Sequence, residues 1–263
     1  MKLSELTNQN TCKPEGRLLL INSTKMKMIK KAILLTFCTV SVLVISSYKP
    51  IKKLELYPKL SSYCDKLSDE FIQIPEERKA ELKDIASFIV EQRKEHKPAN
   101  LLFVCTSNSR RSHMAQVWSQ IASYYYNIDS VFTFSGGTEQ TRVNINAIEA
   151  LNRTGIEFYS NNQGDNPLRY LKVGSKINPW VIFSKKYTDA TNPKKNFAAV
   201  MVCSEADEAC PFVEGAELRI GLPYQDPKAF DNSPLKEAKY DERCRQIARE
   251  MFFIMDVVSK NKL

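Results

Sequence analysis

Hydrophobic and polar positions alternate in blocks along the chain, and the blocks predict strands and helices in turn. Four short apolar runs have the length of buried strands, at residues 101–105, 131–135, 198–203 and 218–222. Apolar residues at helical spacing predict helices between and after them, over residues 111–126, 144–153 and 235–258. Strands that alternate with helices form a parallel sheet with helices on both faces. The pattern therefore predicts an α/β fold built on a four-stranded parallel sheet.

Two segments depart from this alternation. Residues 60–97 read as two helices, and Pro75 opens the second one, which has glutamates near its start and basic residues at its end, as the helix dipole favours. We interpret residues 60–97 as a helical extension, and we favour a packed appendage or spacer over a partner surface. Residues 159–197 are rich in Asn, Pro, Lys and aromatic residues, so we expect an insertion that partly covers the site. The predicted catalytic domain then spans residues 98–263.

An uncharged apolar run, residues 32–47, lies near the amino terminus with lysines on both sides. It is shorter than the ~20 residues that a spanning helix needs and fits the core of a signal peptide better. We interpret residues 1–50 as a leader with a signal peptide or membrane anchor, and we expect translation to start at Met26 or Met28. This predicts an exported protein, periplasmic or membrane-anchored rather than cytoplasmic, whose membrane contact is limited to this segment.

Charge and composition exclude several functions. The net charge is +8, but residues 1–60 hold ten lysines and one arginine against three glutamates, which accounts for all of the surplus. A nucleic-acid-binding protein carries its surplus on the folded domain, so no nucleic-acid partner is expected. The chain has only two histidines, and we expect neither a metal site nor a cofactor.

The first predicted strand ends at Cys105, the first residue of the motif Cys-x5-Arg-Ser. The predicted helix begins at Arg111, directly after the five residues of the loop. Five residues between Cys105 and Arg111 are enough to curl the backbone into a cradle whose amide groups point at one tetrahedral oxyanion. The predicted oxyanion-binding residues are Thr106, Ser107, Asn108, Ser109, Arg110 and Arg111.

Each side chain in this motif has a chemical use. The amides and the helix N-terminus favour the thiolate form of Cys105, which makes it a nucleophile near neutral pH. Arg111 can bind two oxygens of the oxyanion with its planar fork. Ser112 can donate a hydrogen bond from its hydroxyl to the sulfur. The side chain of Asn108 can stabilise the loop by hydrogen-bonding to the loop backbone. The motif predicts an enzyme that acts on an oxyanion or a phosphomonoester.

These residues resemble the low-molecular-weight protein tyrosine phosphatase superfamily, which includes a branch of thioredoxin-coupled arsenate reductases. The resemblance covers about residues 100–158 and 197–258. It is carried by the segments 102–115, 135–139 and 144–151 and by Asp226-Pro227. It implies the four-stranded fold of that superfamily, with Cys105 as the nucleophile and Arg111 stabilising the transferring oxyanion. It also implies that Asp226 protonates the leaving oxygen.

The branch depends on two further cysteines. Cys203 and Cys210 stand seven positions apart in a segment that resembles the arsenate reductases. The resemblance implies that Cys105 forms an adduct with arsenate, that Cys203 attacks the Cys105 sulfur, and that Cys210 then forms a disulfide with Cys203 for a thioredoxin-like reductant to reduce. Our first hypothesis is therefore a thioredoxin-coupled arsenate reductase. The alternative is a low-molecular-weight tyrosine phosphatase that hydrolyses phosphomonoesters through a phosphocysteine at Cys105, and a third hypothesis is a non-catalytic phosphate binder.

Overall fold

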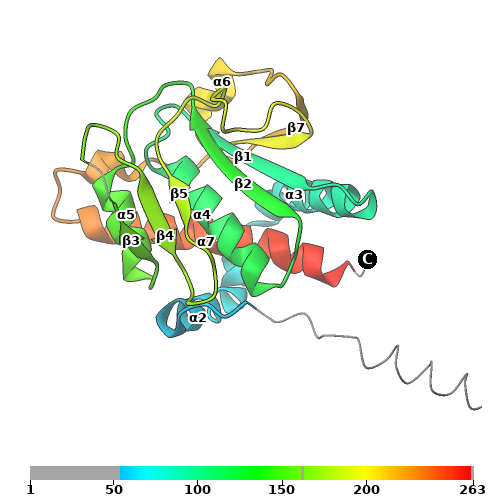
Figure 1. Ribbon diagram of the computed structural model, residues 1–263, viewed down its shortest axis with the longest axis horizontal. Helices are drawn as coiled ribbons and strands as arrows, with labels where there is room; N and C mark the ends of the chain where they lie inside the picture. Colours follow the sequence, from blue (N-terminus) through cyan, green and yellow to red (C-terminus); the bar gives the residue numbers. More distant parts are fainter. Residues whose placement is uncertain (1–53, 161–162, 262–263) are drawn as a thin grey trace, which may run out of the picture. The chain divides into compact units, whose positions relative to one another are not determined.

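The computed structural model describes residues 54–160 and 163–261, and within them the predicted parallel sheet is formed by four strands. These are β1 (Ala99–Cys105), β2 (Val131–Gly137), β6 (Phe197–Met201) and β7 (Ala216–Gly221), in the order β2-β1-β6-β7 (Figure 1). All five residues of β6 are buried, as a continuous apolar run in a central strand requires. The predicted α/β class with a four-stranded parallel sheet is confirmed.

The predicted helices are also present, with ends that differ by one or two residues. They are α4 (Arg111–Tyr125), α5 (Ile145–Arg153) and α7 (Lys236–Lys260). α4 packs against β1 and β2, and α7 packs against both α4 and α5. α5 begins where it does because Asn144 caps it, its side-chain oxygen accepting the backbone N–H of Asn146 at 2.9 Å.

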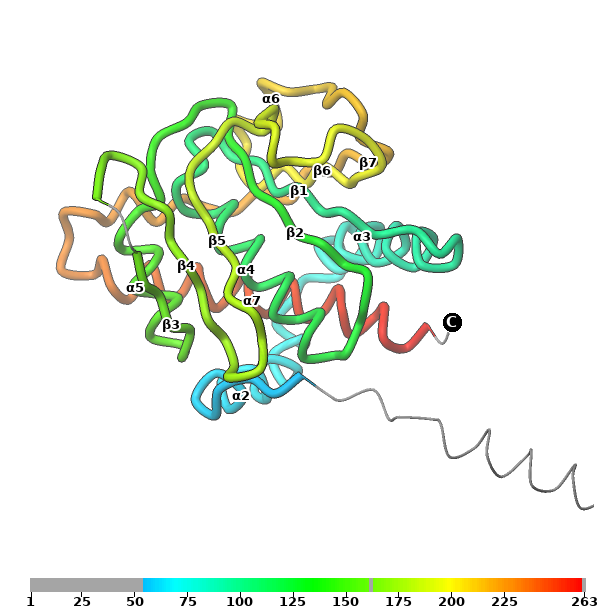
Figure 2. Tube along the Cα trace, in the orientation of Figure 1, coloured from blue at the N-terminus to red at the C-terminus, as the bar shows by residue number. Residues whose placement is uncertain are grey.

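The residues before the sheet form α2 (Pro58–Cys64), the 3-10 helix η1 (Ser68–Gln73) and α3 (Glu76–Lys94). Pro75 immediately precedes α3, where its missing N–H costs nothing. α3 packs against α7, β1 and β7, and the traces of α3 and α7 run beside each other in Figure 2. Leu67, Leu82 and Ile85 are fully buried in the same core as the sheet. The extension is therefore part of the core and more than a spacer.

The segment after α5 holds a second, smaller sheet. Its antiparallel strands are β3 (Glu157–Tyr159), β4 (Arg169–Lys172) and β5 (Trp180–Ile182). The sequence pattern did not predict them because each strand has only three or four residues and most of these are partly exposed. After β5 the chain runs beside the end of β2, where Lys186 forms a parallel bridge with Gly137.

The predicted leader, residues 1–50 with its apolar run at 32–47, lies outside the described residues. Across residues 54–160 and 163–261, no helix combines the length and the apolarity that crossing a membrane requires.

The contact between β2 and the returning segment predicts a requirement for glycine. A Cβ atom at Gly136 would lie 2.4 Å from the Cα of Tyr187, where backbone would have to move. We expect Gly136→Ala to lower the free energy of unfolding by about 1–3 kcal/mol, as overpacking does. Chemical denaturation measures it, with the exposed Gln140→Ala as a control that should stay within about 0.5 kcal/mol of the parent. Equal stability of the two variants would contradict the tight contact.

Candidate active site

The loop between β1 and α4 turns its carbonyl groups outward. Backbone N–H groups of residues 138, 139 and 144 donate to the carbonyls of Cys105, Thr106 and Ser109 at 3.1, 2.8 and 2.9 Å. The carbonyl of Ser107 accepts from the hydroxyls of Thr141 at 2.8 Å and Ser184 at 3.2 Å. By contrast, no described residue accepts a hydrogen bond from the backbone N–H groups of residues 106–110. Amides left free in a concave loop form an anion-binding cradle.

Asn108 stabilises this cradle through side-chain hydrogen bonds to α4 and to the segment after β5. Its φ of 41° lies in the left-handed region, which asparagine tolerates better than most residues. Its Nδ2 donates to Ser112 Oγ at 2.9 Å, and its Oδ1 accepts the backbone N–H of Lys185 at 2.8 Å. Ser112 Oγ lies 3.1 Å from Cys105 Sγ. Since Asn108 already donates to this hydroxyl, the hydroxyl proton is free to point at the sulfur.

His113 is a buried support that the sequence did not single out. Its Nε2 lies 2.9 Å from the carbonyl of Asn108, and its Nδ1 lies 3.1 Å from Ser135 Oγ. Burial, helped by the nearby Lys185 ammonium, lowers the pKa of His113 to about 3. The ring is therefore neutral, and its partners assign the tautomer in which Nε2–H donates to Asn108 and Nδ1 accepts from Ser135. Burial also lowers the pKa of Lys185 itself, to about 8.

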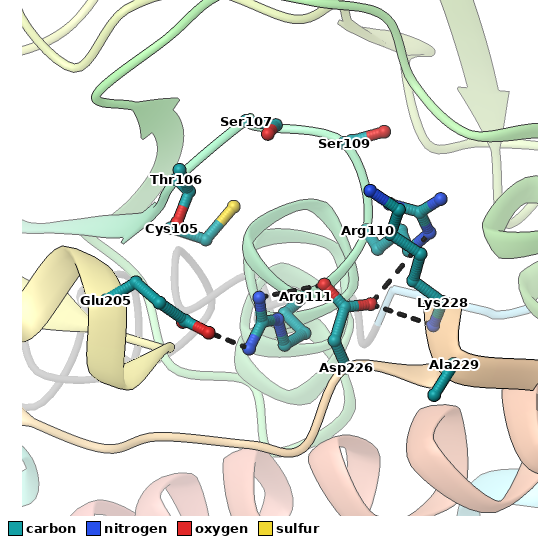
Figure 3. A pocket seen from close by; sticks show the side chains of 10 residues that line it. All are labelled: Cys105, Thr106, Ser107, Ser109, Arg110, Arg111, Glu205, Asp226, Lys228 and Ala229. Atoms are coloured by element: carbon teal, nitrogen blue, oxygen red, sulfur yellow. Dashed lines mark hydrogen bonds and ion pairs between the residues drawn. The ribbon is translucent and has the colours of Figure 1, made fainter.

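Arg111 lies at the first turn of α4, between Glu205 and Asp226 (Figure 3). Its Nη1 donates to the carbonyl of Tyr224 at 2.8 Å, and its Nη2 donates to Asp226 Oδ2 at 2.8 Å. Asp226 caps the short helix η2 (Pro227–Phe230), its Oδ1 accepting the N–H of Lys228 at 3.0 Å. The guanidinium that the motif assigns to the oxyanion thus sits beside the carboxyl that the resemblance assigns to proton transfer.

Seven of the predicted site residues meet in one pocket of about 550 Å³. It is lined by Cys105, Thr106, Ser107, Ser109, Arg110, Arg111 and Asp226, and also by Glu205, Lys228 and Ala229, which the sequence did not predict. Asn108 and Ser112 do not line it and act from behind the loop. None of the described residues of the insertion, 159–160 and 163–197, lines this pocket, and the expectation that the insertion partly covers the site stays a prediction. The insertion supports the outer side of the loop through Ser184 and Lys185.

Arg110 lines the pocket with a guanidinium that is held in place by Tyr240 of α7 and by Asp231 at the end of η2. Its Nε donates to Tyr240 Oη at 2.7 Å, and its Nη2 donates to Asp231 Oδ2 at 3.0 Å. Tyr240 Oη in turn donates to Asp231 Oδ1 at 2.6 Å. The pocket therefore has two fixed guanidiniums, and Arg110 contributes to it through its side chain as well as through the loop backbone.

Neither Cys203 nor Cys210 lines the pocket, but Cys203 lies beside the loop, and Cys210 lies at the far end of the helix that follows Cys203. Cys203 follows β6, the neighbour of β1, and its Sγ lies 3.5 Å from Thr106 Oγ1. Burial raises the pKa of Cys203 above its ordinary value, against the lowering effects of the Thr106 hydroxyl and the Arg111 charge. Cys203 caps the start of α6 (Ser204–Ala209) and Cys210 caps its end, so the helix separates the two sulfurs. Both are free thiols in the structure.

The helical extension supports the site through a chain of buried polar contacts that the sequence did not reveal. Arg78 in α3 donates from Nε to Glu250 Oε2 at 2.9 Å, and its Nη2 donates to the carbonyl of Pro223 at 3.2 Å. Tyr224 Oη donates to the same Glu250 oxygen at 2.8 Å, and burial keeps the pKa of Tyr224 well above its ordinary value. Because the Tyr224 carbonyl holds Arg111, this chain of contacts fixes the guanidinium from outside the loop.

Among the described residues, no group of three or more His, Cys, Asp or Glu side chains is arranged to hold a metal ion.

Protonation of His113 predicts a pH dependence of stability. Its folded pKa of about 3 lies below the ordinary 6.5, so the unfolded chain binds the extra proton between these values. The contribution is complete above pH 6.5 and is lost as the pH falls toward 3, by about 2 kcal/mol between pH 7 and 5. Urea denaturation at both pH values should show this loss in the parent and in the His96→Asn control, and a smaller loss in His113→Gln. An unchanged loss in His113→Gln would show that this ring does not stay neutral.

Removing the guanidinium of Arg78 tests the support from the extension. In Arg78→Met the carboxylate of Glu250 loses a partner and the Tyr224 carbonyl is less constrained, so Arg111 is less well placed. We expect binding of inorganic phosphate to weaken by about tenfold, the equivalent of one charged hydrogen bond. Titration calorimetry measures it, with Lys83→Met on the exposed side of the same helix as the control. Unchanged affinity in a folded Arg78→Met protein would show that the contact chain does not reach the site.

Curated arsenate reductases match this chain in sequence. Those of Bacillus cereus strains AH187 and G9842 are 28% and 29% identical over 149 and 150 residues, which is 57% of this chain and 91% of each relative. That of Bacillus anthracis strain CDC 684 is 29% identical and covers 48% of this chain and 75% of its own length. No family model matches the chain.

Solved structures that match include a low molecular weight phosphotyrosine phosphatase from Vibrio cholerae, with 14% identity and a TM-score of 0.44, over 62% of this chain and 99% of its own. The YwlE arginine phosphatase from Geobacillus stearothermophilus matches with 17% identity and a TM-score of 0.35, over 62% and 92%. The chain is thus similar in sequence to curated arsenate reductases, and its sheet order and cysteine loop are those of an enzyme.

Proposed function

We propose that the chain reduces arsenate to arsenite with Cys105, Cys203 and Cys210, coupled to a thioredoxin-like reductant. The observation that carries this proposal is the position of a second thiol at the edge of the cradle. The N–H of Val202 donates to the carbonyl of Val104 at 2.8 Å, so the ends of β1 and β6 are in register next to Cys105. Cys203 follows directly and touches the loop through Thr106. Hydrolysis of a phosphoester needs no second thiol, whereas reduction does.

The first steps follow from this arrangement. The Cys105 thiolate attacks the arsenic atom of arsenate, water leaves, and a sulfur–arsenic bond forms in the cradle. The Cys203 thiolate then attacks the Cys105 sulfur, and the electron pair of the sulfur–arsenic bond goes to arsenic. Arsenic is reduced from As(V) to As(III) and leaves as arsenite, while the two thiols become a disulfide. Cys203 has to lose its proton first; burial raises the pKa of this thiol, and the Thr106 hydroxyl and the Arg111 charge act in the opposite direction.

The last step requires α6 to unwind. Cys203 and Cys210 flank a helix of six residues, so at about 1.5 Å per residue their Cα atoms lie about 10 Å apart. A disulfide needs Cα atoms within about 7 Å. Cys210 attacks the Cys203 sulfur and releases Cys105 as a thiolate only when the helix has opened. Opening also exposes Cys210, whose side chain is otherwise buried, to the external reductant.

The partner and the compartment are part of the same proposal. A dithiol reductant of the thioredoxin type regenerates Cys203 and Cys210 by exchange. If residues 1–50 direct export, as their apolar run and flanking lysines favour, this reductant works outside the cytoplasm.

A phosphatase activity is the second candidate, and Asp226 favours it. This carboxyl lines the pocket next to Arg111, where it can protonate the leaving oxygen of a phosphomonoester. The pocket also has room for more than one tetrahedral ion, since its volume of about 550 Å³ lies in the range of small-molecule sites.

Parallel assays with arsenate and with an aryl phosphate distinguish the two candidates. With arsenate, thioredoxin and thioredoxin reductase, we expect continuous arsenite production by the parent chain. We expect Cys210→Ser to stop after about one arsenite per chain, because Cys105–Cys203 is then trapped as a disulfide. Cys203→Ser should abolish arsenite release and retain hydrolysis of the aryl phosphate.

The control for these variants is Cys244→Ser, a buried cysteine on α7 whose Sγ accepts the Trp118 N–H and which lies outside the pocket lining. It should retain both activities. Fast hydrolysis of the aryl phosphate by the parent chain, with no consumption of reductant in the presence of arsenate, would refute the reductase proposal and leave the phosphatase.

A further inference from the structure

Arg219 ties the end of α6 that carries Cys210 to the sheet, and the Cys210 thiol also shares a hydrogen bond with the Tyr187 hydroxyl. Arg219 lies on β7, where it pairs with Ala199 of β6, the strand that leads to Cys203. Its Nε donates to the carbonyl of Cys210 at 2.8 Å. Its Nη2 donates to the carbonyl of Asp207 and to Asp207 Oδ1, both at 2.6 Å. The guanidinium thus binds two of the free carbonyls at the C-terminal end of the helix, together with a helix carboxylate.

The same three bonds fix Cys210 relative to Cys203. Both β7 and β6 belong to the parallel sheet, so Arg219 anchors the far end of α6 to the scaffold that holds Cys203 at the near end. Gly221, two residues further along β7, leaves room for this helix, since a Cβ there would lie 2.8 Å from Asp207 Oδ2. A Cys203–Cys210 disulfide cannot form while these contacts hold both ends of α6 apart.

We propose that Arg219 is a positioning residue that stabilises the dithiol form of the Cys203–Cys210 pair and thereby raises the reduction potential of that pair. The inference rests on the proposed function, in which this pair forms the disulfide that the external reductant reduces. The bonds of Arg219 exist only while α6 is folded. They therefore stabilise the reduced state and are absent from the oxidised state, so the disulfide is easier to reduce than it would be without them.

The redox equilibrium that measures this effect involves only the protein thiols, glutathione and glutathione disulfide. One thiolate of the pair attacks a sulfur of glutathione disulfide, forms a mixed disulfide and releases one glutathione. The second thiolate then attacks the protein sulfur of the mixed disulfide and releases the second glutathione. Two protein thiols are oxidised, one glutathione disulfide is reduced to two thiols, and the two thiol protons end on the two glutathione molecules.

The test is a redox titration of the full chain with glutathione and glutathione disulfide, in a Cys105→Ser background so that the nucleophile takes no part. The Cys203–Cys210 disulfide is quantified by mass spectrometry after trapping the free thiols. For Arg219→Gln we expect the equilibrium constant for disulfide formation to rise about tenfold, which is a potential about 30 mV more negative. Arg219→Lys keeps the charge but loses the fork, so it should fall between this variant and the parent.

The matched control is Arg93→Gln, a surface arginine of α3 paired with Asp129 and remote from α6 in the chain. Its potential should equal that of the parent, and circular dichroism should confirm that each variant is folded. A folded Arg219→Gln protein with the parent potential, or with a more positive one, would overturn the inference. So would the absence of any Cys203–Cys210 disulfide in the parent at every glutathione ratio.

Failure of the proposed function gives a different result. If the parent chain never reduces arsenate but Arg219→Gln still shifts the reduction potential, then the reductase proposal fails. The proposed role of Arg219 in stabilising the dithiol form is then retained. If the parent reduces arsenate and the potential does not move, then only the inference about Arg219 fails.

Discussion

The outward orientation of the carbonyl groups in the loop 105–111 is the constraint on which the rest of the site depends. A peptide group that turns its oxygen outward turns its N–H inward, so the partners outside the loop determine what the inside can bind. Those partners come from the end of β2, from the start of α5 and from the segment after β5. The anion cradle is thus produced by contacts that never touch the anion.

Two segments outside the residues that carry the resemblance contribute to this constraint. The segment after β5 supplies Ser184 and the backbone of Lys185, which hold the loop at Ser107 and Asn108. The helical extension supplies Arg78, which reaches the site through Glu250 and Tyr224. In both cases the added residues act on the backbone or on buried polar groups, and none of them enters the pocket.

The sequence was informative where the chemistry and the periodicity are local. The apolar runs are long enough to show the four parallel strands, and the spacing from Cys105 to Arg111 is enough to predict a cradle, because both depend on neighbours in the chain. The sequence did not indicate Glu205 and Lys228 because they reach the pocket from two separate short helices, α6 and η2. The sequence did not indicate that His113 and Glu250 support the site. Within a helical pattern, a buried titratable residue cannot be distinguished from a surface one until its partners are known. The short strands β3, β4 and β5 have too few residues for any periodicity to show.

The packing of α3 and η1 against α7 has a practical consequence for the boundaries of the enzyme. Ile247, Met251 and Ile254 of α7 are fully buried in the core that the extension shares. A truncated protein that begins at residue 98, the predicted start of the catalytic domain, would lose helices that help to bury this surface. Apolar surface uncovered in this way promotes self-association in solution. We therefore expect a protein that keeps α2, η1 and α3 to fold better than one that begins at residue 98, because these helices share the core with α7.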